Sequence, residues 1–160
     1  MPTAVPCSSL LVIGVGNPLR GDDGVGLVLV RRLQAHFGSR LSTLEMMAPD
    51  VAWAERIAAC RELLVIDAAA DAAAAPFGLV DVAAASSPLP AGGWVSHRFD
   101  WPAILTLARQ VYGRAPRTRL LAVCGVDFGI RESLSAACRQ NAEAAFAFLV
   151  DTIGAIIDPR

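Results

Sequence analysis

Leu10–Leu33 reads LLVIGVGNPLRGDDGVGLVLVRRL and carries the features of a strand, a loop and a helix in that order. Its first four residues, Leu10–Ile13, form a short apolar run with β-branched members, which favours a buried parallel strand. Gly14–Pro18 ends the strand, because this glycine-rich segment lets backbone approach backbone and does not continue a regular element. The apolar segment Leu27–Leu33 predicts the helix that follows.

Two adjacent carboxylates, Asp22 and Asp23, stand at the expected start of this helix. A carboxylate at that position would cap the first turn and interact favourably with the helix dipole. Gly14 and Gly16 also fit the first two glycines of the dinucleotide motif G-x-G-x-x-G, but Leu19 stands where the third belongs. Two acids would repel a pyrophosphate, so a cation suits this loop better, and a small nucleotide-binding α/β protein is the less favoured alternative.

The longer run from Gly14 to Gly26, GVGNPLRGDDGVG, resembles the N-terminal signature of the hydrogenase maturation endopeptidases. The resemblance implies an aspartyl-type endopeptidase that removes the C-terminal extension of a nickel–iron hydrogenase large-subunit precursor after nickel insertion. It also implies that the nickel is carried by the substrate and serves for recognition. The partner implied is the large-subunit precursor, and the compartment is the cytoplasm.

The composition predicts one domain that spans residues 1–160, with the hydrogenase-maturation-protease-like fold that the resemblance implies. The hydrophobic content is 54% and the mean hydropathy is +0.48, yet no apolar run reaches the roughly 18 residues of a membrane span. The first residues lack the pattern of a signal peptide, so we expect a cytoplasmic protein. A net charge of −1 argues against nucleic acid or a membrane surface as partner, and we expect a monomer.

The four cysteines are scattered and form no C-x-x-C pair; they are Cys7, Cys60, Cys124 and Cys138. Three of them stand in apolar patterns that predict strands or helices. We therefore interpret them as buried thiols that act as small hydrophobic side chains, rather than as zinc ligands or disulfide partners.

The remaining patterns alternate between strands and helices. After a first helix over Val25–Phe37, strands are predicted at Arg40–Met47, Leu63–Ile66, Phe77–Val82 and Leu120–Cys124, and helices after Pro49, after Asp100 and after Ser133. Residues 77–82 follow the preceding strand without a crossover helix, which predicts an antiparallel strand at an edge. The fold class predicted is α/β, a three-layer αβα sandwich with a mainly parallel twisted sheet of about five strands and helices on both faces.

Three side chains are candidates for chemistry at the carboxyl ends of the strands, where parallel sheets bind ligands. Asp23 follows the first strand, Asp67 directly follows the third, and His97 lies in the long loop after the fourth. Two carboxylates and one imidazole with open positions suit nickel or zinc. Each residue could instead have an ordinary structural role. Asp23 could cap a helix, Asp67 could cap a turn, and His97 could be a histidine without a special role in a surface loop.

The resemblance adds roles to these positions. It implies that Asp23 and Asp67 are the catalytic residues, and that Asp23, Asp67 and His97 contact the metal. An alignment of the loop without gaps would put Arg98 at the ligand position, and an arginine cannot bind a metal. Either His97 serves through a shift of one residue, or a ligand has been lost. The second case implies a non-catalytic relative that binds a hydrogenase tail or a maturation factor.

Overall fold

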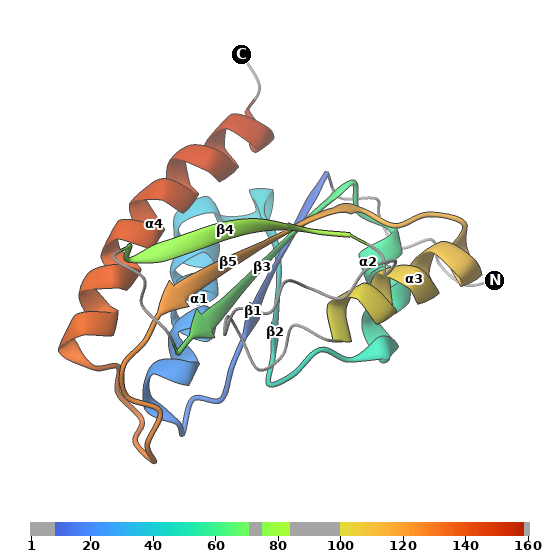
Figure 1. Ribbon diagram of the computed structural model, residues 1–160. Coiled ribbons are helices and arrows are strands. Elements are labelled where there is room, and N and C mark those ends of the chain that lie inside the picture. Colours follow the sequence, from blue (N-terminus) through green and yellow to red (C-terminus); the bar gives the residue numbers. More distant parts are fainter. Residues whose placement is uncertain (1–8, 71–74, 84–99, 159–160) are drawn as a thin grey trace.

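A five-stranded sheet between two layers of helices forms the body of the protein (Figure 1). The computed structural model describes residues 9–70, 75–83 and 100–158. The strands are β1 (Leu10–Val15), β2 (Ser42–Met46), β3 (Glu62–Ala69), β4 (Phe77–Val82) and β5 (Arg117–Cys124). The helices are α1 (Val25–Phe37), α2 (Ala54–Ala58), α3 (Asp100–Tyr112) and α4 (Ala136–Ile157).

The strand order in the sheet is β2-β1-β3-β5-β4. β1 pairs in parallel with β2 and β3, β3 pairs in parallel with β5, and β4 runs antiparallel to β5 at the edge. The predicted fold class is confirmed, as is the edge position of β4. The physical reason is the length of the connection from β3, which ends at Ala69, to β4, which begins at Phe77: it is too short for the crossover helix that a parallel strand needs.

Each face of the sheet is covered by a pair of helices. α1 and α4 pack on one face, and α2 and α3 pack on the other (Figure 1). Each layer has its own apolar cluster, because side chains alternate between the two faces along every strand. Val12 and Leu64 belong to the cluster under α1 and α4, whereas Ile13 and Val65 belong to the cluster under α2 and α3.

Two glycines of the first loop-and-helix unit serve the packing of α1 on the sheet. A Cβ atom at Gly14 would lie 2.8 Å from Val30 Cγ1 and would also meet the carbonyl oxygen of Gly26. A Cβ atom at Gly26 would meet the carbonyl oxygens of Val15 and Ile66. The close approach of helix to strands therefore accounts for this glycine spacing, without any phosphate ligand.

Two local expectations differ from the structure. The final helix begins after Ser135, whose hydroxyl accepts a hydrogen bond from Cys138 N at 3.1 Å, and Ser133 is not its cap. The helix expected after Pro49 begins as a short 3-10 turn, which Asp50 caps by accepting from Ala52 N at 2.8 Å.

The cysteines within the described residues are buried as expected, with exposed fractions of 5% or less for Cys60, Cys124 and Cys138. Cys7 lies outside the described residues, as does the predicted long loop over Ser86–His97. Among the helices that the structure describes, none has the length and apolar character needed to cross a membrane.

Candidate functional site

The crevice between the carboxyl ends of β1 and β3 is the topological switch point of the sheet. The connection that leaves β1 leads to β2 on one side, and the connection that leaves β3 leads toward β5 and β4 on the other. Ligands in open α/β sheets bind where neighbouring connections diverge in this way. Gly14 pairs with Ile66 in the register, so Asp67 lies level with the last residue of β1.

Asp67 is a buried carboxyl group with an unsatisfied oxygen. It lies inside β3, two residues before the end of the strand, and not after the strand as the sequence predicts. Its exposed fraction is 1%. Oδ1 accepts a hydrogen bond from Ala68 N at 2.8 Å, whereas Oδ2 has no hydrogen-bond partner among the described residues. A buried oxygen without a donor is uncommon in folded proteins and calls for a functional explanation.

The surroundings of Asp67 favour its protonated form. Burial raises the pKa of Asp67, the hydrogen bond from Ala68 lowers it, and the nearby charge of Asp23 raises it further, to about 7. The effect of Asp23 means that the two carboxylates lie within range of direct electrostatic interaction. A cation between them would cancel the repulsion between the two carboxylates and would give Asp67 Oδ2 the partner that it lacks among the described residues. This set of oxygen ligands therefore fits a metal.

Asp23 is half-buried in a 3-10 turn between β1 and α1. Its Oδ2 accepts a hydrogen bond from Asn17 N at 2.8 Å, and no hydrogen bond reaches its Oδ1 from the residues described. Gly16, with φ of +146°, precedes this turn, and a Cβ atom there would collide with the backbone carbonyl of Asp23. The glycine therefore lets the backbone at residue 16 approach the backbone of Asp23 closely.

Asp22, the neighbour of Asp23, has a different role. It is fully buried, and its Oδ2 accepts hydrogen bonds from Val126 N, Asp127 N and the Ser135 hydroxyl at 2.8–2.9 Å. Its Oδ1 accepts from Ser135 N at 2.6 Å. Burial by itself would raise the pKa of Asp22, but the hydrogen bonds from Ser135, Val126 and Asp127 outweigh it, and the pKa is lowered.

Neither acid caps α1, contrary to the sequence-based expectation. The residue at the start of α1 is Gly24, and no side chain caps this helix. Asp22 instead fastens the loop after β5 and the beginning of α4, more than 100 residues away in the sequence. No local pattern signals a contact of that kind, which is why the sequence analysis missed this role.

The third predicted ligand lies outside the described residues. His97 and Arg98 belong to the segment 84–99, so the choice between them stays a prediction. Within residues 9–70, 75–83 and 100–158, no group of three His, Cys, Asp or Glu side chains is arranged to hold a metal ion. The roles of Asp23, Asp67 and His97 as catalytic and metal-binding residues therefore stay predictions too.

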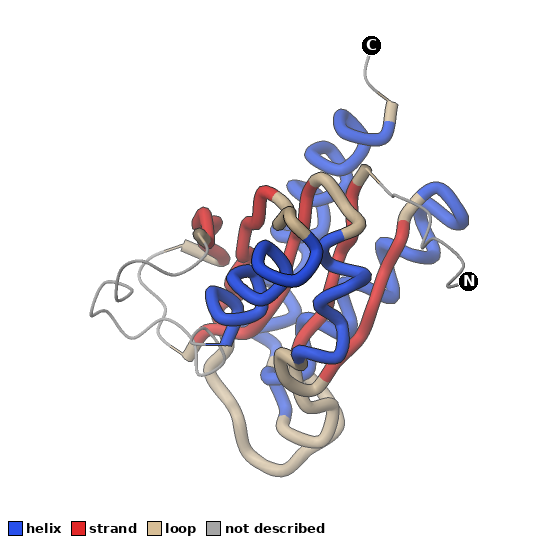
Figure 2. Tube along the Cα trace, turned by 90° about the vertical axis from the view of Figure 1, so that its right-hand side faces the viewer, coloured by secondary structure: helices blue, strands red, loops and turns tan. Residues whose placement is uncertain are grey.

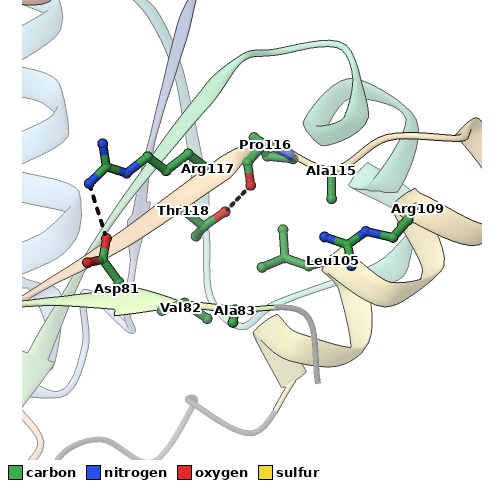
Figure 3. Close-up of a pocket in the computed structure, with 9 residues that line it drawn as sticks. All are labelled: Asp81, Val82, Ala83, Leu105, Arg109, Ala115, Pro116, Arg117 and Thr118. Atoms are coloured by element: carbon green, nitrogen blue, oxygen red, sulfur yellow. Dashed lines mark hydrogen bonds and ion pairs between the residues drawn. The ribbon is translucent and has the colours of Figure 1, made fainter. Parts of the chain in front are cut away.

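A separate cavity of about 400 Å³ lies at the opposite edge of the sheet, where β5 begins and β4 ends (Figure 3). Figure 3 shows Asp81 and Arg117 beside it as an ion pair at 3.8 Å, with Arg109 reaching in from α3. Both partners of the ion pair are exposed, and none of the predicted site residues lines this cavity. The carboxyl group at the switch point, and not this cavity, is therefore the candidate site.

The fold is that of the hydrogenase maturation endopeptidases. The chain superposes on the hydrogenase maturating endopeptidase HybD of Escherichia coli with a TM-score of 0.73, at 19% identity and with 91% of each chain covered. It superposes on the [NiFe] hydrogenase maturation protease HybD of Thermococcus kodakarensis with a TM-score of 0.73, at 19% identity, covering 89% of this chain and 97% of the other. The resemblance seen in the signature is thus confirmed at the level of the fold.

A short sequence match points the same way. Over 32 residues the chain is 47% identical to a protein of Methanocaldococcus jannaschii that is provisionally named a hydrogenase maturation protease. The match spans 20% of this chain and about a fifth of that protein's length. No family model matches the chain.

Proposed function

We propose that this protein is an endopeptidase that removes the C-terminal extension of a nickel–iron hydrogenase large-subunit precursor once nickel is inserted. The observation that supports this function best is the buried Asp67 at the switch point, whose Oδ2 has no donor among the described residues and whose pKa is raised by burial and by the charge of Asp23. The fold shared with maturation endopeptidases and the 32-residue match support the same reaction. We place the reaction in the cytoplasm and class the enzyme as aspartyl-type.

In this proposal the nickel belongs to the substrate. Asp67 Oδ2 and the Asp23 carboxylate would contact it, with His97 as a third ligand, and so hold the precursor with its tail beside the two acids. Carboxylate oxygens and an imidazole are ligands that nickel accepts. The positive charge would counteract both causes that raise the pKa of Asp67, burial first and the charge of Asp23 second.

Asp67 and Asp23 would also supply the chemistry of hydrolysis. Together with the nickel that they hold, they would orient the tail and polarise the scissile carbonyl or the attacking water. Hydrolysis then replaces the peptide bond by a carboxylate and a free amine, and the proton of the water passes through this pair of acids to the departing amine. Asp23, whose Oδ2 is fixed by Asn17 N, would orient the water or the tail.

The test is cleavage of a purified, nickel-loaded precursor, followed by gel shift and by the mass of the released tail. We expect Asp67→Asn and Asp23→Asn each to slow cleavage at least about 100-fold, the size of effect typical for groups that transfer protons. Asp81→Asn, in the separate cavity, is the matched control and should cleave at the wild-type rate. Cleavage retained in the double variant Asp23→Ala, Asp67→Ala would refute the assigned roles.

Nickel dependence is tested separately. Wild-type protein should cleave the nickel-loaded precursor and leave the nickel-free precursor intact. His97→Ala should weaken cleavage of the loaded precursor, whereas Arg98→Ala should not. Tight binding of the loaded precursor without any tail release would instead identify a non-catalytic relative.

A further inference from the structure

Two loops at the carboxyl edge of the sheet are fastened to each other. Residues 16–24 follow β1 and residues 125–135 follow β5; we call them the paired loops. Arg131 N donates to Leu19 O at 3.0 Å, Gly21 N donates to Arg131 O at 2.8 Å, and Asp22 N donates to Asp127 O at 2.8 Å. Figures 1 and 2 both show loops that extend beyond the strands at this end of the molecule, and the orange one in Figure 1 follows β5.

The buried carboxylate of Asp22 holds the paired loops in one conformation. It links them through the amides of Val126, Asp127 and Ser135. Gly125 fits against it so closely that a Cβ atom there would lie 2.7 Å from Asp22 Cβ. The hydrogen bonds to Asp22 therefore hold the inner parts of the paired loops, from which the outer parts project.

The paired loops carry three large apolar side chains that are exposed. Leu19 is 54% exposed, Val126 62% and Ile130 96%. Leu19 and Ile130 are close, because the backbone of Leu19 pairs with that of Arg131. Single apolar residues on a surface need no explanation, but three on one ordered pair of loops indicate a surface that binds another protein.

We infer that Leu19, Val126 and Ile130 form the docking surface for the folded body of the large-subunit precursor. This inference rests on the proposed function. Leu19 lies in the same loop as Asp23, four residues before it, so the paired loops adjoin the site at which the tail would be cut. We therefore assign the three apolar side chains and the two acids to one interface with the precursor.

The charges beside the docking surface specify the partner further. Arg20 is exposed, and within the described residues its guanidinium donates only a 3.4 Å hydrogen bond, to Phe128 O. Arg131, by contrast, is paired with Asp127 at 2.6 Å. Arg20 therefore has donors left for a carboxylate. The matching surface of the precursor is apolar with an acidic side chain at its margin.

The docking surface is tested with Ile130→Glu and Val126→Glu against Val111→Glu. Val111 is the matched control, because it is 61% exposed on α3, where nothing is proposed to bind. Two measurements are made: KM and kcat for precursor cleavage, and the Kd for the mature, tail-free large subunit by calorimetry. We expect Ile130→Glu to raise KM and Kd at least about 10-fold with kcat within about two-fold, since central apolar contacts dominate such interfaces.

The outcomes separate this inference from the proposed function. Equal Kd and KM for Ile130→Glu and Val111→Glu would overturn the docking surface, even if the wild-type protein cleaves the precursor. So would a wild-type dimer in sedimentation that becomes a monomer in Ile130→Glu, because the occupant would then be a second copy. Loss of mature-subunit binding in Ile130→Glu, with none of the proteins cleaving precursor, would support docking and refute the peptidase. A melting temperature unchanged in Ile130→Glu confirms that the variant is folded.

Discussion

Two carboxyl groups, Asp22 and Asp67, are buried to the same extent but have opposite surroundings. Asp22 is fully buried and accepts four hydrogen bonds, and its pKa is lowered. Asp67 is 1% exposed and accepts one, and its pKa is raised to about 7. The number of donors, rather than the depth of burial, thus separates a carboxylate that stabilises the fold from one available for chemistry.

The same contrast separates two neighbours in the sequence. Asp22 and Asp23 lie in one 3-10 turn, in which successive side chains point in different directions. Asp22 accepts hydrogen bonds at the start of α4, whereas the charge of Asp23 contributes to the raised pKa of Asp67. One short acidic motif therefore supplies both a structural anchor and a candidate site residue.

The strongest test of this contrast is Asp22→Ala. The variant removes the buried acceptor of the amides of Val126, Asp127 and Ser135, so we expect a loss of at least about 3 kcal/mol in the free energy of unfolding. Urea denaturation measures it. Asp23→Asn is the control and should change stability by less than about 1 kcal/mol. Similar losses for both variants would remove the distinction between the two neighbours.

The second test uses the pH dependence of Asp67. Its pKa of about 7 in the folded protein exceeds the ordinary value of 3.8, so the folded state binds the proton more tightly. Its contribution to stability is therefore complete below about pH 4 and is lost as the pH rises toward 7. We expect wild-type protein to lose about 2–3 kcal/mol between pH 5 and pH 8 relative to Asp67→Asn.

Urea denaturation of wild-type protein and Asp67→Asn at both pH values measures this difference. The variant isolates one group, because every other titrating side chain is common to the two proteins. A gap between the two free energies that stays constant with pH would mean that Asp67 is not desolvated as described.

A third test alters the packing around Asp22 without changing a carboxylate. Gly125→Ala places a Cβ atom 2.7 Å from Asp22 Cβ and 2.9 Å from Phe128 Cζ. We expect a loss of about 2 kcal/mol, typical of overpacking, as measured by thermal unfolding. Gly154→Ala is the control, since a Cβ atom there meets nothing within 4 Å. A loss of stability no larger than that of the control would show that the paired loops shift readily to make room for the added Cβ atom.

The smallest effect is expected for Ser135→Ala. Its hydroxyl donates to Asp22 Oδ2 at 2.8 Å and caps α4 by accepting from Cys138 N. We expect a loss of about 1 kcal/mol, because the three amide donors of Asp22 remain. The rate of precursor cleavage, measured well below the melting temperature, should stay at the wild-type level. A large fall in that rate would connect the Asp22 anchor to catalysis itself.

Most of the fold followed from local patterns. The boundaries of α1 match the prediction over Val25–Phe37, and β4 lies antiparallel at the edge, as its short connection indicates. Helix starts were less reliable, as the shift from Ser133 to Ser135 illustrates. Capping depends on which hydroxyl reaches the free amides, and here the position of Ser135 is fixed by Asp22 from the far end of the chain.

The candidate site was predicted only in part. The sequence indicated Asp23 and Asp67 because strand-end acids gather at the switch point of a parallel sheet. The family resemblance selected Asp23 as the ligand, whereas the pattern offered Asp22 no role other than that of a helix cap. The sequence also gave no sign that Ile130 is 96% exposed.

The sequence by itself determined the order of strands and helices, the α/β class and the identity of the acids, because these depend on periodicity and spacing along the chain. Only the tertiary structure decided that Asp22 is satisfied by hydrogen bonds, that Asp67 Oδ2 has no donor among the described residues, and which apolar side chains remain exposed to solvent. Those properties depend on donors and neighbours brought from more than 100 residues away, and local sequence does not encode such contacts.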